Sequence, residues 1–166
     1  AHIQACKNGP EIVNCLFEGL NDDAVNLYGV PYSIQAKYAD NHFAVYTSGK
    51  MLTVGDKMVL FRPSNGTILG HATVTTTAGN TPVNGYSCVD ITIDPAIPGV
   101  VVGDGNDTFY DETWMSGNFL IAYSTFRNFR GSLRLKTHDG MVTNNTFQGL
   151  SSTGLLVQNE CGTWVE

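Results

Sequence analysis

The fold is decided by the stretch Val13-Asn-Cys-Leu-Phe-Glu-Gly-Leu-Asn-Asp-Asp-Ala-Val-Asn-Leu-Tyr-Gly29, because the chain contains two further versions of it. Residues 143–159 repeat it as Thr-Asn-Asn-Thr-Phe-Gln-Gly-Leu-Ser-Ser-Thr-Gly-Leu-Leu-Val-Gln-Asn. Residues 124–137 contain a shorter version, Ser-Thr-Phe-Arg-Asn-Phe-Arg-Gly-Ser-Leu-Arg-Leu-Lys-Thr. The first two align without a gap and share Asn-x-x-Phe-x-Gly-Leu, which indicates a common backbone frame.

The spacing of the repeats is typical of a solenoid. Phe126 and Phe147 lie 21 residues apart, and Leu133 and Leu155 lie 22 apart. Aliphatic residues alternate with polar or small ones in each repeat, which puts one face of a short strand inside each coil. Asn and Gly supply the left-handed turns between strands. We therefore predict an all-β protein, a right-handed parallel β-helix with few coils. A leucine-rich repeat is the alternative, but its helical half is missing.

A segment of antiparallel character interrupts the repeats. Residues 57–62 lead through Pro63-Ser-Asn-Gly66 into residues 67–75, as in a hairpin, and residues 87–94 form another alternating strand. We predict a small antiparallel β-barrel inserted into the β-helix. The predicted organisation is coils at 1–47, the inserted barrel at 48–115 and coils at 116–166.

Composition excludes several classes of function. The formal net charge is -6 over 166 residues, whereas proteins that bind nucleic-acid phosphates concentrate Lys and Arg. No apolar run is long enough to span a bilayer. We therefore expect neither a nucleic-acid partner nor a membrane partner. The chain starts at Ala1 without an initiator Met or a signal peptide, which indicates a processed, cleaved or shortened N-terminus.

The cysteines form no zinc pattern. Cys6 and Cys15 are too far apart for a zinc knuckle, and Cys88 and Cys161 are isolated. The simplest interpretation is four buried small hydrophobes, with disulfides as the alternative. The segment Asp104-Gly-Asn-Asp107 resembles a calcium loop but lacks the downstream bidentate Glu. No metal and no cofactor is predicted.

The candidate catalytic residues are Asp22 and Asp23, which stand where the copy has Ser152 and Thr153. Adjacent carboxylates repel each other and need a cation or hydrogen bonds to stay ionised near an apolar coil. Because neighbouring strands lie about 4.8 Å apart, stacking of the repeats places Asp22 beside the Arg130 corner. An acid pair beside arginines on the outer face of a parallel sheet indicates a site that cleaves sugars, and a solvated turn is the alternative.

Other residues are candidates for contact with a substrate. Stacking also places Asn26 beside Arg134. The alternative is that Arg134 is a solvated residue on the outer face with no role in a site. Trp164 offers a surface for the apolar face of a sugar, or equally a core or capping aromatic. His2 is an incidental surface residue in its simplest interpretation. The predicted substrate-binding residues are Arg130, Arg134, Asn26, Trp164, Glu166 and His2.

Taken together, the coils, the insertion and their order resemble glycoside hydrolase family 110. These are exo-acting α-1,3-galactosidases with a β-helix that a small β-barrel interrupts. The resemblance covers nearly all of this chain but only part of such an enzyme. It rests on Asn-Cys-x-Phe-x-Gly-x-Asn-Asp-Asp-Ala-Val-Asn at 14–26, Val54-Gly55-Asp56, Gly103-Asp104, Arg127-Asn-Phe-Arg-Gly131, Thr143-Asn-Asn-Thr-Phe147 and Trp164-Val-Glu166.

The resemblance implies an inverting mechanism. Inversion needs a carboxylic acid and a carboxylate about 6.5–9.5 Å apart, and two adjacent residues can hardly supply both. Asp22 and Asp23 are therefore expected to form the base side, and another coil should supply the acid. In the family an Asp precedes the Ala-x-His segment, just before where this chain begins. The resemblance also implies that Arg130 orients the substrate and that Trp164 and Glu166 contact the sugar.

The resemblance further implies a galactose-containing oligosaccharide or polysaccharide as the partner, and a secreted or periplasmic location in a bacterium. Because the chain ends within the expected fold, we expect a fragment, a truncated gene product or a homo-oligomer that covers the exposed β-helix ends. Two alternatives remain open. One is a non-catalytic carbohydrate-binding or assembly module, and the other is a different β-helix polysaccharide-degrading enzyme such as a lyase.

Overall fold

The computed structural model describes residues 1–47, 51–103 and 106–158, which form an all-β protein with one short 3-10 helix, Glu112–Trp114. This confirms the predicted all-β class. None of the helices in these ranges is long and apolar enough to cross a membrane. The chain divides into two compact units: a parallel unit, which contains residues 1–30 and 114–158, and a barrel unit, Pro31–Thr113.

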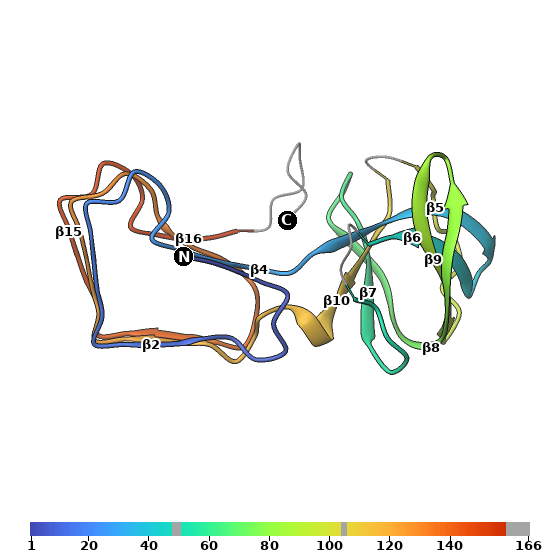
Figure 1. The fold of residues 1–166 in the computed structure, drawn as a ribbon, viewed down its shortest axis with the longest axis horizontal. Coiled ribbons are helices and arrows are strands. Elements are labelled where there is room, and N and C mark those ends of the chain that lie inside the picture. Colours follow the sequence, from blue (N-terminus) through green and yellow to red (C-terminus); the bar gives the residue numbers. More distant parts are fainter. Residues whose placement is uncertain (48–50, 104–105, 159–166) are drawn as a thin grey trace. The chain divides into compact units, whose positions relative to one another are not determined.

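The parallel unit consists of three sheets in which every strand pair is parallel (Figure 1). The chain passes through all three sheets repeatedly, and we call each such pass a coil. The first coil contains β2 (Glu11–Val13), β3 (Leu16–Glu18) and β4 (Val25–Tyr28), and β1 (His2–Gln4) pairs with β4. The second contains β11 (Leu120–Ala122), β12 (Thr125–Arg127) and β13 (Leu133–Lys136). The third contains β14 (Met141–Thr143), β15 (Thr146–Gln148) and β16 (Leu155–Val157).

The register of the coils follows the sequence repeat. Phe126 pairs with Phe147, and Leu133 pairs with Leu155, as predicted. Phe17 joins the same row, and the three phenylalanine rings stack with centroids 4.9 and 5.1 Å apart. The inward residues form one apolar core, whose buried members are Ile12, Ala24, Val25, Leu27, Phe119, Ile121, Phe126, Phe129, Leu133 and Leu135.

Left-handed residues turn the chain at the coil corners. One row contains Asn14, Tyr123 and Asn144, with φ of 55°, 51° and 53°. A second row contains Gly19, Asn128 and Gly149, with φ of 67°, 53° and 60°. Asn and Gly tolerate this conformation better than other residues, so the corners form where the sequence predicts them.

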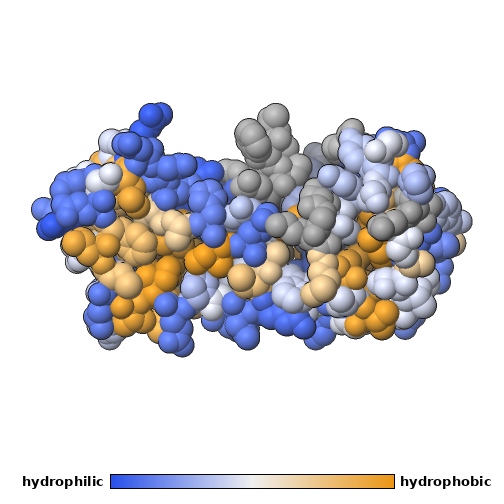
Figure 2. Space-filling view, viewed as in Figure 1, coloured by the Kyte–Doolittle hydropathy of each residue, from blue (hydrophilic) through white to orange (hydrophobic). Residues whose placement is uncertain are grey.

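The first and last coils expose apolar side chains. Leu16 in the first coil is 57% exposed, and Val157 in the last is 69% exposed. Figure 2 shows apolar surface on the face of the parallel unit seen in that view. The other large apolar side chains exposed in these two coils are Val13, Met141, Phe147 and Leu155.

The barrel unit is a closed six-stranded barrel of order β10-β5-β6-β9-β8-β7, with antiparallel pairing throughout. The predicted hairpin is present as β7 and β8, and the later predicted strand as β9. The strands are β5 (Pro31–Ala39), β6 (His42–Tyr46), β7 (Lys57–Arg62), β8 (Thr67–Val83), β9 (Tyr86–Asp94) and β10 (Thr108–Asp111).

The barrel begins earlier than the sequence analysis placed it. Strands β5 and β6 lie inside the range 1–47 that was assigned to coils, yet both belong to the closed barrel. The nine residues of β5 exceed the three or four of each coil strand. Tyr32 and Ile34 alternate into the barrel interior and are each 1% exposed. A long strand with this alternation suits an antiparallel barrel, which explains why β5 belongs to the barrel and not to a coil.

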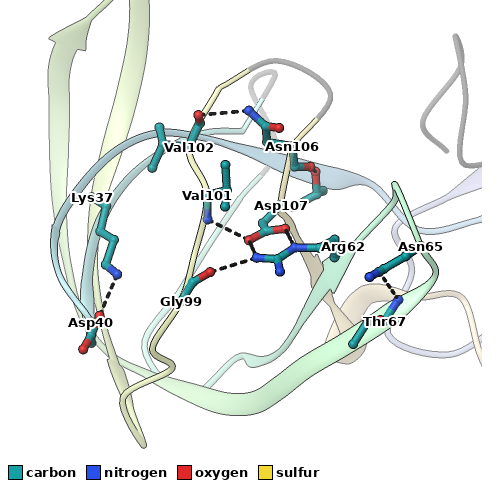
Figure 3. A network of polar contacts seen from close by, with 11 residues as sticks. Lys37, Asp40, Arg62, Asn65, Thr67, Gly99, Val101, Val102, Asn106 and Asp107 are labelled. Carbon is teal, nitrogen blue, oxygen red and sulfur yellow. Dashed lines mark hydrogen bonds and ion pairs between the residues drawn. The ribbon is translucent and has the colours of Figure 1, made fainter.

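An ion pair with a buried carboxylate holds the loop that precedes β10 (Figure 3). Arg62 binds the Asp107 carboxylate through Nε and Nη2, at 2.7 Å each, and also donates to the Gly99 carbonyl at 2.8 Å. The Val101 N–H donates to the same carboxylate at 2.7 Å. Burial alone would raise the pKa of Asp107, but these hydrogen bonds and the Arg62 charge lower it overall. Asp107 is therefore part of a structural ion pair.

The cysteines of the described chain are free thiols, and their burial differs from the prediction. Cys88 is buried, but Cys6 is half-buried and Cys15 is exposed. Cys6 and Cys15 follow left-handed corner residues, Ala5 and Asn14, so they lie at the coil surface and not in the core. Cys161 lies outside the described residues.

Candidate functional site

The two candidate catalytic aspartates lie at the corner that leads into β4. Asp22 is exposed, whereas the Asp23 side chain is only 9% exposed. Oδ1 of Asp22 accepts a hydrogen bond from the Asp23 N–H at 2.8 Å. The structure therefore gives two adjacent carboxylates different surroundings.

Asp23 is bound to the second coil through both carboxylate oxygens. The Ser132 N–H donates to Oδ1 at 2.8 Å, and Nε of Arg134 lies 3.1 Å from Oδ2. The Arg134 side chain is 29% exposed, so water screens this ion pair less than it screens a fully exposed one. The cation and the N–H together fix the position of the Asp23 carboxylate.

The outer face of the same sheet carries a row of polar residues. Asn26 pairs in register with His2 on one side and with Arg134 on the other. Asn26 is 4% exposed, and its Oδ1 has no hydrogen-bond partner among residues 1–47, 51–103 and 106–158. A buried amide oxygen without a donor costs about 1–3 kcal/mol, so this row contains an acceptor that no described residue satisfies. The exposed His2 contacts the edge of Tyr28, with centroids 6.3 Å apart.

A second row, next to the first, was not predicted as part of the site. Lys136 pairs in register with Tyr28, and its Nζ lies 5.6 Å from the centre of that ring. Lys136 is only 6% exposed. A cation over an aromatic face is a stabilising contact. The register of the repeats already aligns these two residues, and that signal could have revealed the contact.

The remaining predicted substrate-binding residues are Arg130, Trp164 and Glu166. Arg130 is exposed and donates its backbone N–H to the Leu20 carbonyl at 3.0 Å. The ion pair of the acid site comes from Arg134. The structure thus brings Asp23, Asn26, His2 and Arg134 together along one sheet, with Asp22 at the corner next to Asp23. Trp164 and Glu166 lie outside the described residues.

A second pair of acids lies inside the barrel unit and was not predicted. Asp56 and Asp111 are 3% and 2% exposed. The backbone N–H and the Oγ1 hydroxyl of Thr53 both donate hydrogen bonds to the Asp56 carboxylate, at 2.7 and 3.0 Å. The pKa of Asp111 is raised to about 7, mainly because the carboxyl is buried and to a lesser extent because of the charge of Asp56. Within residues 1–47, 51–103 and 106–158, no group of three or more metal-ligating side chains occurs.

The chain is similar to α-1,3-galactosidases, although no family model matches it. It is 22% identical to alpha-1,3-galactosidase A of Peterkaempfera griseoplana over 185 residues, 99% of this chain and 25% of that protein. It is 26% identical to alpha-1,3-galactosidase B of Bacteroides fragilis over 180 residues, 99% of this chain and 29% of that protein. A third relative, alpha-1,3-galactosidase B of Parabacteroides distasonis, is 24% identical over 184 residues, 99% of this chain and 29% of that protein.

The chain thus spans between a quarter and a third of the length of these relatives. The alignment takes in both units, since it covers 99% of this chain. This distant similarity supports a relationship to glycoside hydrolases.

Proposed function

We propose that this chain carries the base side of the active site of an inverting glycoside hydrolase that releases terminal α-1,3-linked galactose. One observation carries the proposal: Asp23 is bound by Arg134 and Ser132 next to an exposed Asp22. A base that activates water must lie within reach of that water, and the exposed Asp22 carboxylate meets this requirement. The similarity to α-1,3-galactosidases supports the choice of substrate.

We further propose that the three parallel sheets are the walls of a right-handed parallel β-helix, with glycoside hydrolase family 110 as the family. Three coils stack with unbroken parallel register, and each corner row contains left-handed residues. In this arrangement the barrel unit is an insertion between the first and second coils. The longer relatives leave room for additional coils.

In the proposed reaction a water molecule attacks the anomeric carbon from the face opposite the leaving group. A carboxylate of the Asp pair takes the proton of this water, while a separate general acid protonates the leaving oxygen. That acid should lie about 6.5–9.5 Å from the base, which neither adjacent aspartate can satisfy for the other. Arg130, His2 and Arg134 are the proposed contacts for sugar hydroxyls.

The proposal is tested by hydrolysis of nitrophenyl α-galactoside and of α-1,3-galactobiose, with the product anomer followed by NMR. The expected first-formed product is β-galactose, and Asp22→Asn is expected to lower kcat by about 10³-fold or more. Glu11→Gln on the neighbouring sheet is the matched control and should leave turnover unchanged. Galactoside binding without turnover would favour the carbohydrate-binding alternative, and an unsaturated product that absorbs in the ultraviolet would favour a lyase.

A further inference from the structure

We infer that Gly131, Ser132 and Arg134 form a clamp that holds Asp23 as a positioning residue and leaves Asp22 as the carboxylate that activates water. The inference rests on the proposed function, because it divides the two acids of that site between two roles. The three clamp residues come from the second coil, immediately beside the corner that carries the acids.

The second coil turns this corner with one residue fewer than its neighbours. Phe126 and Leu133 lie seven positions apart, whereas the equivalent pairs in the first and third coils lie eight apart. The shorter corner contains Gly131, with a φ of +135°. Only glycine adopts this conformation without strain.

The backbone at Gly131 also lies directly against the peptide bond that joins the two acids. A Cβ at this position would lie 2.5 Å from the carbonyl carbon of Asp22 and 2.6 Å from both its oxygen and the Asp23 nitrogen. These are backbone atoms, so rotation of a side chain cannot relieve the clash. Glycine therefore allows the second coil to approach closely enough to bind Asp23.

That close approach engages Asp23 on both oxygens. The Ser132 N–H and Arg134 Nε lie 2.8 and 3.1 Å from Oδ1 and Oδ2 respectively. The Ser132 carbonyl also accepts the Ala24 N–H at 3.0 Å, so the segment after Asp23 is fixed as well. Both Asp23 oxygens thus face protein groups, which leaves them less accessible to a water molecule than the carboxylate of the exposed Asp22.

Asp22 is more accessible to solvent than Asp23. It is exposed, and Oδ1 accepts the Asp23 N–H at 2.8 Å. Its Oδ2 makes no hydrogen bond or ion pair to any residue in the described ranges of the chain. A base must reach the water from which it takes a proton, and Asp22 offers a free oxygen for that purpose. Asp23 fixes the orientation of Asp22 through the peptide bond between them.

The clamp is tested first without activity, by amide hydrogen exchange in the full chain. Gly131→Ala is expected to speed exchange at the Ser132 amide about tenfold or more, because the Asp23 contact opens. Gly19→Ala is the matched control: it also has positive φ, +67°, but its Cβ would meet no atom within 4 Å. Asp23→Ala, which keeps the backbone but removes the acceptor of the Ser132 N–H, should also speed exchange at Ser132. Unchanged exchange in both variants would overturn the clamp.

The division of roles is tested on nitrophenyl α-galactoside with added azide. Azide attacks the anomeric carbon in place of water, forming a C–N bond while the C–O bond to nitrophenolate breaks, and it needs no base. We expect azide to raise turnover of Asp22→Ala about tenfold or more, with β-galactosyl azide as product, and not that of Asp23→Ala. Rescue of Asp23→Ala alone would reverse the two roles. If the wild-type chain hydrolyses no galactoside, the role of Asp22 fails with the proposed function, while the exchange result still decides the clamp.

Discussion

At the residue scale, Tyr123 departs from the preference of left-handed backbone for Asn and Gly. Tyr123 has a φ of 51° and occupies the row in which the neighbouring coils have Asn14 and Asn144. Its side chain is 61% exposed, so burial offsets little of the backbone cost. A bulky residue in the left-handed region costs about 1–2 kcal/mol.

Tyr123→Asn is therefore expected to raise the free energy of unfolding by about 0.5–1 kcal/mol. Urea unfolding followed by circular dichroism measures the change. The reciprocal variant Asn144→Tyr, one coil away, serves as the matched control and should lower the same quantity. A Tyr123→Asn protein less stable than wild type would contradict the expected backbone strain.

At the element scale, the stacked phenylalanines connect β3, β12 and β15 across the three coils. Phe126 lies in the middle and is 0% exposed, whereas Phe147 at the end of the row is 36% exposed. Each coil strand has only three or four residues, so a strand by itself makes few hydrogen bonds. Apolar contacts between coils must therefore provide much of the stability of this unit.

Phe126→Ala is expected to lower the free energy of unfolding by about 3–5 kcal/mol, because it opens a cavity between two rings. Phe147→Ala removes the same atoms from a partly exposed position and should cost less than half as much. Parallel urea titrations of the two variants measure the difference. Equal losses would mean that burial in the row does not determine the contribution of each ring.

At the scale of the whole molecule, the stability of the barrel unit is expected to depend on pH. Burial, and then Asp56, raises the pKa of Asp111 from 3.8 to about 7. Between these values the folded barrel binds more protons than the unfolded chain. The stabilisation is thus complete below about pH 4 and is lost as pH rises through about 7.

We expect the barrel unit to lose on the order of 2–4 kcal/mol of stability between about pH 4 and pH 8 from this carboxyl. Asp111→Asn keeps an acceptor for the Thr113 N–H and should remove most of that loss. Hydrogen exchange at barrel amides, followed by NMR at several pH values, measures it. Asp107→Asn is the control. The pKa of Asp107 is lowered, so its contribution to the stability of the barrel unit changes only at acidic pH, below this pH range. A wild-type barrel equally stable across this range would contradict a neutral Asp111.

Much of the parallel unit could be predicted because its signals are local. The pairing of Phe126 with Phe147 follows from residues that recur at a fixed spacing. The acid pair stood out because the copy replaces it with Ser152 and Thr153. The start of the barrel was placed too late, because β5 and β6 have no hairpin signal as strong as Pro63-Ser-Asn-Gly66.

By itself, the sequence determined the all-β class, the register of the coils and the position of Asp22 and Asp23. Strand alternation and left-handed corners depend on neighbouring residues, so they can be recognised along the chain. Only the tertiary structure decided that Arg134 pairs with Asp23 and that Asp111 is buried beside Asp56. These outcomes depend on where side chains from distant segments point and how much water they lose, and both are set when the chain packs.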